Sequence, residues 1–336
     1  MDMLRIGLLG CGSMGSSLAK TAHGLDAAEV VAASDVVEEK ARKLAGELGE
    51  GANGVRGVKV FSEYRALLAQ EDVDAVIVAS PGYLHEEMVV AAAEAGKHLF
   101  CEKPMAFSVA ACDRMIRAAK EGSVKLMIGQ VLRYLPVFNR IKEIVDSDTL
   151  GRPFGISITR IGGGWRASGT SWRLNKAQVG GVLYEVSVHE LDFMRYIAGD
   201  VDRVAAFAGQ FVETHCDYED LVQILLHFQC GGSGSLLAGM SSAIGSYEGK
   251  ILCEQGSIFF GWSGLRYKPF DGEEVRVSKE EIDTEPGVRR EVREFVEAVL
   301  EDTEPTIPGE EGRKVIEMVE AAYRSAEEMR EVALTE

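Results

Sequence analysis

Polar residues stand at regular spacing inside an otherwise apolar stretch of this chain. Residues 180–193 read GGVLYEVSVHELDF, in which Glu185, His189 and Asp192 are surrounded by valine, leucine and phenylalanine. On a helix these three positions lie on one face, because residues three and four apart are neighbours. The imidazole suits a general base, since histidine titrates near neutral pH. The alternative is a core histidine with Glu185 as an internal ion-pair partner.

A second set of polar residues follows two apolar runs. The segment HLFCEKP places Glu102 and Lys103 directly after a predicted strand, and VASPGYLH places Ser80, Pro81 and His85 after another. Ligands of parallel sheets bind beyond the carboxyl ends of the strands, so both ends are candidate site positions. Lys103 is placed to act on a bound ligand. The alternative is that Lys103 is an ordinary loop lysine in contact with solvent. His85 either lies near that ligand or caps the helix that begins there.

A glycine-rich motif near the start of the chain is typical of dinucleotide-binding sites. Residues 10–15 read GCGSMG, which matches GxGxxG, follows a predicted strand and opens a predicted helix. Gly10 permits the tight turn, Gly12 lets a pyrophosphate approach the backbone, and Gly15 lets the helix pack against the strand. The helix N-terminus then faces the phosphates with its partial positive charge. We expect this turn, with Ser13 and Met14, to bind the cofactor; otherwise the glycines only shape the turn.

Asp35 ends the second predicted strand, 20 residues after Gly15, where dinucleotide-binding chains carry an acidic residue that binds a ribose. Its carboxylate can accept hydrogen bonds from a ribose 2′-hydroxyl and repels a 2′-phosphate. Val36 and Val37 follow it, rather than an arginine. NAD is therefore favoured over NADP, although basic residues come soon after, at positions 40, 42 and 43.

The elements that must position these residues alternate between strand and helix through the first part of the chain. Continuous apolar runs predict strands buried on both faces, and amphipathic segments between them predict helices. The predicted strands cover 4–10, 29–35, 73–80, 98–104 and 125–130; the helices cover 36–49, 85–96 and 108–123, besides one after the glycine motif. This alternation predicts a doubly wound parallel sheet, in a domain over residues 1–129.

From about residue 151 the pattern changes. Short β-rich segments broken by glycines, with few helices between them after residue 200, predict a largely antiparallel sheet. Two helical segments follow, over 290–302 and about 311–332. We therefore expect an α/β protein whose second domain, residues 130–336, is an α+β domain with an open, largely antiparallel sheet.

Composition narrows the classes of partner. The formal net charge of −17 argues against nucleic acid or an anionic membrane as a partner. No apolar run reaches the length of a membrane helix, and no signal peptide precedes the first strand. The six cysteines form no CxxC pair and mostly lie in apolar runs, as expected of buried free thiols in a reducing compartment. We expect a soluble cytoplasmic protein, and no metal site, since His-Glu never extends to HExxH.

Several motifs together resemble those of the Gfo/Idh/MocA oxidoreductases, which include glucose–fructose oxidoreductase and inositol dehydrogenases. They are GxGxxG with Asp35, SPGYLH, EKP, Arg133 with Pro136 in VLRYLPVF, GGVLYEVSVHELD, and the closing EGRKVIEMVEAAYRSAEE. The motifs keep the family's order and extend over nearly the whole chain. The resemblance is therefore far more specific than any single motif.

The resemblance implies an N-terminal Rossmann domain and a C-terminal domain whose open sheet often forms the interface of a homodimer or homotetramer. It also implies a catalytic site in the cleft between the domains, where Lys103, in a Lys–Pro motif that is commonly cis, meets His189 and the nicotinamide. His189 would take the substrate's hydroxyl proton, and Lys103 would stabilise negative charge on the same oxygen. The implied cofactor contacts outside the glycine motif are Asp35, Ser80, Pro81, His85, Glu102 and Lys103.

One position departs from the family pattern. The family usually has aspartate four residues before the histidine, whereas this chain has Glu185. The added methylene keeps the charge but moves the carboxylate. We expect Glu185 to orient Lys103 or His189, while the departure leaves the usual sugar substrate in question.

A long segment connects a predicted strand to the helix that carries His189. Residues 161–181 are rich in side chains that could stack on a polyol or hydrogen-bond to it, and Arg133 is a further candidate for substrate contact: Trp165, Arg166, Trp172, Arg173, Asn175 and Arg133. The arginines of the segment could also pair with a carboxylate, so an acidic substrate is an alternative to a neutral one. The alternative is a lid or interface loop with no substrate contact.

The expected function is hydride transfer between NAD and a secondary alcohol or ketone of a sugar, a cyclic polyol or a related small hydroxy compound. Two alternatives use the same parts. One is a redox-neutral elimination or hydrolysis with tightly bound NAD, and the other is a non-catalytic, ligand-sensing regulator. Net accumulation of NADH separates the dehydrogenase from both.

Overall fold

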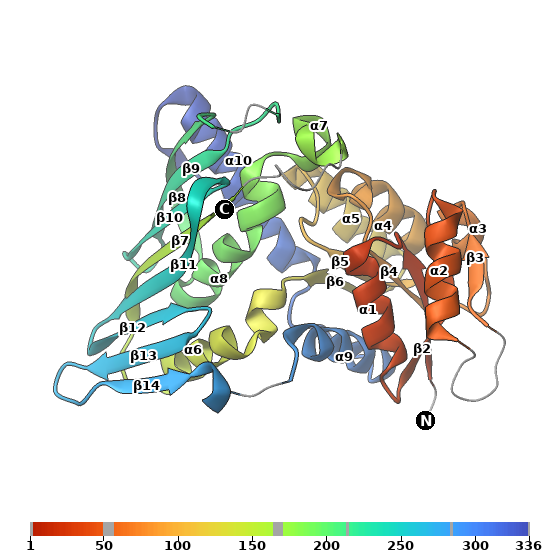
Figure 1. The fold of residues 1–336 in the computed structure, drawn as a ribbon, viewed down its shortest axis with the longest axis horizontal. Helices are drawn as coiled ribbons and strands as arrows, with labels where there is room; N and C mark the ends of the chain where they lie inside the picture. The colour runs from red at the N-terminus through yellow and green to blue at the C-terminus, as the bar shows by residue number, and fades with distance from the viewer. Residues whose placement is uncertain (1–2, 50–56, 164–170, 213–214, 283–284, 335–336) are drawn as a thin grey trace. The chain divides into compact units, whose positions relative to one another are not determined.

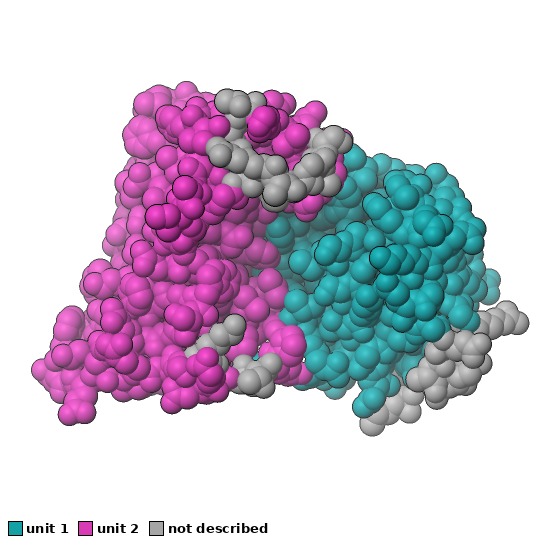
Figure 2. Space-filling view, viewed as in Figure 1, with its two compact units in different colours: residues 1–130, 288–313 teal, residues 131–287, 314–336 magenta. Residues whose placement is uncertain are grey.

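The computed structural model describes residues 3–49, 57–163, 171–212, 215–282 and 285–334. The chain divides into two compact units (Figure 2). Unit 1 consists of residues 1–130 and 288–313, and unit 2 of residues 131–287 and 314–336. The chain first passes from unit 1 to unit 2 after residue 130, and it passes between them twice more because the segment 288–313 returns to unit 1.

A parallel six-stranded sheet forms the centre of unit 1 (Figure 1). Its order is β3-β2-β1-β4-β5-β6, so the chain starts in the middle of the sheet and winds outward in both directions. This confirms the doubly wound α/β sheet that the alternating pattern predicts. The strands are β1 (Leu4–Leu9), β2 (Ala28–Ser34), β3 (Lys59–Phe61), β4 (Ala75–Val78), β5 (His98–Glu102) and β6 (Leu126–Gly129).

The long helices of unit 1 follow the expected segments, and the unit also has a short strand and a short helix that the sequence did not predict. Ser108 caps α5 as expected, since its side chain accepts a hydrogen bond from the Ala111 amide at 3.2 Å. These two elements are β3 and α3, which have three and five residues and are too short to give a periodic pattern. The helices are α1 (Ser13–His23), α2 (Glu38–Leu48), α3 (Tyr64–Leu68), the 3₁₀ turn η1 (Gly82–Leu84), α4 (His85–Glu94), α5 (Val109–Glu121) and α9 (Gly287–Leu300).

A nine-stranded sheet forms the centre of unit 2, in the order β14-β13-β12-β11-β7-β10-β9-β8-β15. Its neighbouring strands are antiparallel except for β7 and β10, which confirms the largely antiparallel sheet expected from the sequence. The strands are β7 (Pro153–Gly163), β8 (Val201–Gly209), β9 (Leu221–Phe228), β10 (Ser233–Gly239), β11 (Ser241–Cys253), β12 (Gly256–Gly261), β13 (Gly264–Pro269), β14 (Val275–Ser278) and β15 (Val332–Ala333).

Helices pack on one face of this second sheet (Figure 1). The helices in contact with the sheet are α6 (Pro136–Asp146), the π-helix η5 (Leu183–Ser187), α8 (Val188–Ala198) and α10 (Gly309–Glu328). Unit 2 also contains η2 (Val131–Tyr134), η4 (Ser171–Leu174), α7 (Lys176–Val179) and η6 (Lys279–Glu281). Along β9 the burial alternates, so that Leu225 is 54% exposed between the buried Ile224 and Leu226. The sheet face that Leu225 occupies therefore carries apolar side chains outside the core.

No described helix is long and apolar enough to cross a membrane. None of the six cysteines, all of which lie in the described part of the chain, forms a disulfide; five of them are buried as expected, whereas Cys230 is exposed. The described residues also hold no cluster of three or more His, Cys, Asp or Glu side chains suited to a metal ion.

Candidate active site

The turn after β1 uses each of its three glycines differently. Gly10 has φ +100°, and a Cβ there would lie 2.7 Å from the Ala79 carbonyl oxygen. A Cβ on Gly15 would lie 2.0 Å from the Gly10 carbonyl oxygen, so only glycine lets α1 pack this closely. A Cβ on Gly12 would meet nothing within 4 Å. The open space therefore lies at the N-terminus of α1, where Ser13 begins the helix and Met14 is exposed, and where a phosphate is favoured.

Asp35 follows β2 and is tied to the same turn. Its Oδ2 accepts a hydrogen bond from the Cys11 amide at 2.9 Å, and its Oδ1 accepts one from the Val37 amide at 2.8 Å. Each carboxylate oxygen has a second lone pair, so Asp35 can still accept hydrogen bonds from a ribose. Burial, and then the charge of Asp35, raises the pKa of the Cys11 thiol to about 12. This thiol therefore stays protonated at neutral pH and is no nucleophile.

The segments after β4 and β5 are joined through His85. This residue is fully buried, with Nδ1 2.8 Å from the Pro104 carbonyl oxygen and Nε2 2.9 Å from the Ser80 carbonyl oxygen. The peptide bond between Lys103 and Pro104 is cis, as the resemblance implies. Both ring nitrogens thus face the backbone of the two segments, and the α4 N-terminus has no side-chain cap. His85 therefore fixes the position of the Lys103 segment relative to Ser80 and Pro81.

Lys103 is half-buried at the end of β5. The neighbouring Glu102 is buried, and its Oε2 accepts a hydrogen bond from the Lys103 amide at 3.1 Å. The backbone on both sides of the lysine is therefore held in place, by Glu102 before the cis bond and by His85 after it. These contacts fix the backbone of the lysine that the sequence singles out.

In unit 2, Glu185 and His189 lie on either side of a change in helix type. Glu185 belongs to the π-helix η5, and His189 to the first turn of α8. A π turn contains more residues than an α turn, so Glu185 is displaced from the strict one-face alignment that an α-helix would give. Both side chains are partly exposed, whereas Asp192 is fully buried.

The Glu185 carboxylate is paired with an arginine from the preceding segment. Arg173 Nε donates a hydrogen bond to Glu185 Oε1 at 2.9 Å, and the Arg173 guanidinium lies 4.3 Å from the centre of the Trp172 ring. Tyr218 donates a hydrogen bond to the Arg173 carbonyl oxygen at 2.7 Å. Asn175 instead caps α7, since its Oδ1 accepts a hydrogen bond from the Ala177 amide at 2.9 Å. Arg173, one of the expected substrate-contacting residues, is thus brought to Glu185, and Trp172, another of them, lies beside the Arg173 guanidinium.

Arg133 and Asp192 form a buried ion pair. The guanidinium donates from Nε to Oδ2 at 2.8 Å and from Nη2 to Oδ1 at 2.6 Å, and both side chains are at most 4% exposed. A bidentate pair of this kind joins η2 to α8. The arrangement supports a structural role for Arg133 more than the substrate contact expected from the sequence. Trp165 and Arg166, also expected to contact substrate, lie outside the described residues.

Sequence reasoning missed a pocket on the helix-covered face of the unit 2 sheet, which includes Arg160, Tyr247 and Trp262. A signal was present in ISITRI, residues 156–161. Ile156, Ile158 and Arg160 alternate along one strand, so the arginine lies on the same face as two buried isoleucines. A charged residue at such a position indicates a buried partner or a ligand.

Comparison with known proteins identifies the family. A family model described as an oxidoreductase family with an NAD-binding Rossmann fold matches residues 4–130, and a model of the GFO/IDH/MocA C-terminal domain matches residues 138–259. The myo-inositol 2-dehydrogenase of Thermotoga maritima is 30% identical over 354 residues, which cover 99% of each chain. This chain belongs to the Gfo/Idh/MocA oxidoreductase family. The 2,7-anhydro-N-acetylneuraminate hydratase of Escherichia coli strain K12 is also 30% identical, over 70% of this chain and 61% of the hydratase.

Solved structures share the fold of this Gfo/Idh/MocA oxidoreductase. Levoglucosan dehydrogenase in complex with NADH and levoglucosan has a TM-score of 0.89 at 23% identity, over all of both chains. An oxidoreductase from Agrobacterium radiobacter, in complex with NAD⁺, L-tartaric acid and magnesium, has a TM-score of 0.88 at 21% identity, over 99% of both chains.

The cofactor of this Gfo/Idh/MocA oxidoreductase is NAD, and the first unit fits it. The space beside Gly12 is open at a helix N-terminus, as a pyrophosphate requires. The acidic acceptor for a ribose is Asp35, hydrogen-bonded to the same turn. These two features would hold the cofactor, and the family model that matches this unit describes an NAD-binding fold.

Proposed function

We propose that this oxidoreductase is a dehydrogenase that oxidises a secondary alcohol of a cyclic polyol, a sugar or a related small hydroxy compound, and reduces the ketone in the reverse direction. Bound NAD supplies the hydride acceptor. The observation that carries the proposal is the similarity over 99% of the chain to a protein named myo-inositol 2-dehydrogenase.

In this proposal Lys103 and His189 act on the oxygen of the reacting alcohol. The Lys103 ammonium donates a hydrogen bond to that oxygen and stabilises the negative charge that develops on it. His189 takes the hydroxyl proton during oxidation and returns it during reduction. The held backbone around Lys103, between Glu102 and His85, supports this role because a catalytic donor must be preorganised.

The Glu185 carboxylate acts as a positioning group in the same proposal. It is hydrogen-bonded to Arg173 and lies four residues before His189.

We also propose that NAD is preferred over NADP, since Asp35 places a negative charge where a 2′-phosphate would lie. The cysteines, which form no disulfide in the described part of the chain, support a cytoplasmic location, where thiols remain reduced.

The test is the absorbance of NADH when the purified protein meets NAD and a panel of cyclic polyols, aldoses and sugar acids. The proposal predicts accumulation of NADH with at least one secondary alcohol. A flat trace with every compound, from protein that binds NAD, would contradict it.

A redox-neutral reaction is the second candidate. The observation that favours it is the hydratase relative, which is as similar in identity as the dehydrogenase, though over less of the chain. In this case NAD would survive dialysis and no net NADH would form, while a substrate in the panel would be consumed. Product analysis by NMR separates the two candidates.

We further propose that two copies associate through the apolar face of the unit 2 sheet. This proposal is supported by four exposed side chains on that face from four strands: Phe207, Leu225, Leu252 and Phe259. Light scattering after gel filtration should give the mass of a dimer or tetramer for the wild type, and a smaller mass for Leu225→Asp. A monomeric wild type would contradict the proposal.

A further inference from the structure

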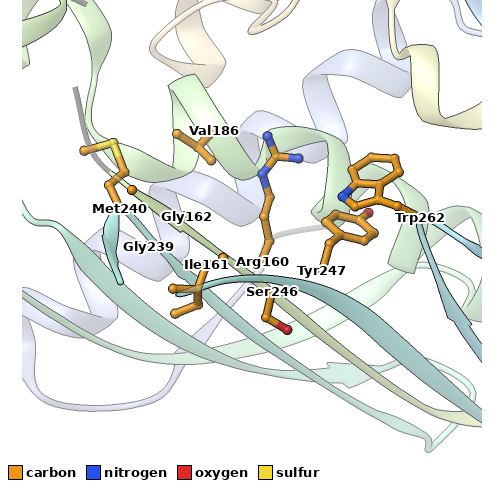
Figure 3. A pocket seen from close by; sticks show the side chains of 11 residues that line it. Arg160, Ile161, Gly162, Val186, Gly239, Met240, Ser246, Tyr247 and Trp262 are labelled. Atoms are coloured by element: carbon orange, nitrogen blue, oxygen red, sulfur yellow. The ribbon is translucent and has the colours of Figure 1, made fainter. Parts of the chain in front are cut away.

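A cavity of about 450 Å³ opens on the helix-covered face of the unit 2 sheet (Figure 3). This size is within the range of small-molecule sites. Strands β7 and β11 provide Arg160 and Tyr247, the turn after β12 provides Trp262, and Val186 of η5 lines another wall. Since Val186 directly follows Glu185, the cavity adjoins the helix that carries the proposed catalytic histidine.

A cation and a buried anion lie together at this cavity. Arg160 Nη1 donates a hydrogen bond to Glu190 Oε1 at 2.9 Å, with Glu190 fully buried and the Arg160 side chain 30% exposed. Glu190 Oε2 has no hydrogen-bond partner among the described residues. Burial raises the pKa of Glu190, and the charge of Arg160 opposes this effect. The ion pair offsets the charge of the guanidinium, and Arg160, which has further N–H donors, lines the cavity.

Two aromatic rings form the wall beside this pair. The Tyr247 and Trp262 ring centres are 4.1 Å apart at an interplanar angle of 30°, and the Arg160 guanidinium lies 5.9 Å from the Tyr247 ring centre. The Tyr247 hydroxyl is buried near Glu190 and makes no well-formed hydrogen bond within the described residues. Burial, followed by the Glu190 charge, raises the pKa of this hydroxyl, so it remains a donor. The wall thus offers an apolar ring surface beside the Arg160 guanidinium.

We propose that this cavity binds the substrate and selects uncharged rings over their acidic counterparts, with Arg160 donating hydrogen bonds to ring hydroxyls, Glu190 cancelling its charge and Trp262 providing the apolar surface. The inference rests on the proposed function for its substrate class. A carboxylate would gain little from a guanidinium that is already paired, and it would lie close to the buried Glu190 charge. A neutral hydroxyl accepts the same hydrogen bonds without that repulsion.

Calorimetric binding to the NAD-loaded Lys103→Ala protein tests this inference without turnover. The probes are matched pairs, D-glucose with D-glucuronate and D-galactose with D-galacturonate, together with myo-inositol. We expect a neutral member to bind at least about tenfold more tightly than its acid. Binding of no probe, or tighter binding of the acids, would overturn the inference. Failure to form NADH in the wild type would contradict the proposed function and leave this result unchanged.

Charge substitutions make the test sharper. Glu190→Gln keeps an acceptor for Arg160 but removes its charge, so the affinity for uronates relative to neutral sugars should rise at least about tenfold. Arg160→Gln should weaken the binding of neutral sugars about tenfold, and so should Trp262→Ala. An unchanged ratio in Glu190→Gln, or unchanged affinities in both other variants, would overturn the proposal.

Matched controls come from outside the cavity. Arg203 is ion-paired with Glu331 at 3.3 Å, and Phe270 is an exposed aromatic side chain. Arg203→Gln and Phe270→Ala should leave the affinities and the neutral-to-acid ratio unchanged. NAD affinity and thermal unfolding, measured for every variant, show whether a lost affinity belongs to the cavity or to unfolding.

Discussion

Glu185 stands where the resemblance leads us to expect aspartate, and in the structure it is hydrogen-bonded to Arg173. The hydrogen bond of 2.9 Å joins a carboxylate that is 13% exposed to a guanidinium that stacks on Trp172. The longer side chain therefore does not leave the charge unpaired. Arg173 comes from the segment before the helix, so the pair fixes that segment to η5.

We expect this pair to be coupled in catalysis. Glu185→Gln and Arg173→Gln should each lower kcat/KM, and the double variant should lose less than the two losses together, with a coupling of about 1 kcal/mol. The exposed pair Arg152–Glu254 is the control, and its cycle should give a coupling near zero in unfolding free energy. If the losses of kcat/KM in the two single variants add up to the loss in the double variant, the contact between Glu185 and Arg173 does not contribute to catalysis.

The position of Asp35 leads to a prediction about the preference for NAD over NADP. Asp35→Asn keeps an acceptor for the Cys11 amide but removes the charge that opposes a 2′-phosphate. The ratio of the Kd for NADP to the Kd for NAD should fall at least about tenfold, which corresponds to about 1.4 kcal/mol. Fluorescence titration with both cofactors measures the ratio. If the ratio is the same as in the wild type, another residue discriminates between them.

At the scale of elements, the N-terminus of the η5–α8 helical segment is held by two residues distant in the sequence. Glu219 Oε1 accepts a hydrogen bond from the Val182 amide at 2.8 Å and another from the Tyr323 hydroxyl. The Leu183 amide donates to the Tyr323 oxygen at 3.1 Å. Burial, and then the Glu219 charge, raises the pKa of the Tyr323 hydroxyl, so it stays a donor. These bonds satisfy amides that a helix N-terminus leaves without partners.

Tyr323→Phe should therefore disturb the helix that carries Glu185 and His189. Loss of the hydroxyl leaves a buried amide unsatisfied, so the free energy of unfolding should fall by about 1–3 kcal/mol. We expect kcat to fall while NAD affinity is unchanged. Tyr64→Phe is the matched control, because its hydroxyl bonds the exposed Glu87 at 2.7 Å. Urea unfolding with steady-state kinetics measures both effects, and a wild-type kcat would rule out the positioning role.

The ion pairs at the C-terminal end of α8 lead to a prediction about how stability depends on pH. Burial opposes ionisation of Asp200, but hydrogen bonds from Lys314 at 2.8 Å and Arg195 at 2.7 Å outweigh it and lower the pKa. Because the pKa is lowered on folding, the ionised carboxylate stabilises the fold fully at a pH above the pKa of an aspartate in the unfolded chain, about 3.9. This stabilisation is lost as the pH falls through the pKa of Asp200 in the folded protein.

Asp200→Asn should consequently lower Tm at pH 7, and the difference from the wild type should shrink as the pH falls below about 4. Thermal unfolding between pH 7 and pH 3 measures this, with the exposed Asp271→Asn as the control. A difference that stays constant over this range would mean that ionisation of Asp200 adds nothing to stability.

At the scale of the whole molecule, the elements set by local patterns were predictable. Buried apolar strands and amphipathic helices gave the parallel sheet, and glycine-broken β-rich segments gave the second sheet. The strand β3 was not predictable, because three residues give no periodicity. The return of residues 288–313 to unit 1 was also missed, since an amphipathic pattern shows that a helix has an apolar face but not which sheet covers it.

The candidate site was predictable where chemistry is tied to spacing, and not where it depends on contacts distant in the sequence. The glycine turn and Asp35 lie close in sequence, and the structure joins them directly. The partner of Arg133 lies 59 residues away, and the pair is visible only in the fold. The same holds for Arg160 and Glu190, which are 30 residues apart. The π turn that displaces Glu185 has no sequence signal that we can name.

We propose that Lys103 serves hydride transfer from an alcohol to NAD. The most direct measurement is the rate of NADH formation in a single turnover, with saturating NAD and an active compound of the panel, for the wild type and for Lys103→Ala. We predict a rate at least about 10²-fold lower in the variant, with NAD affinity within about twofold, because a charge-stabilising donor is removed from the reacting oxygen. NADH formation at the wild-type rate in Lys103→Ala would contradict the account.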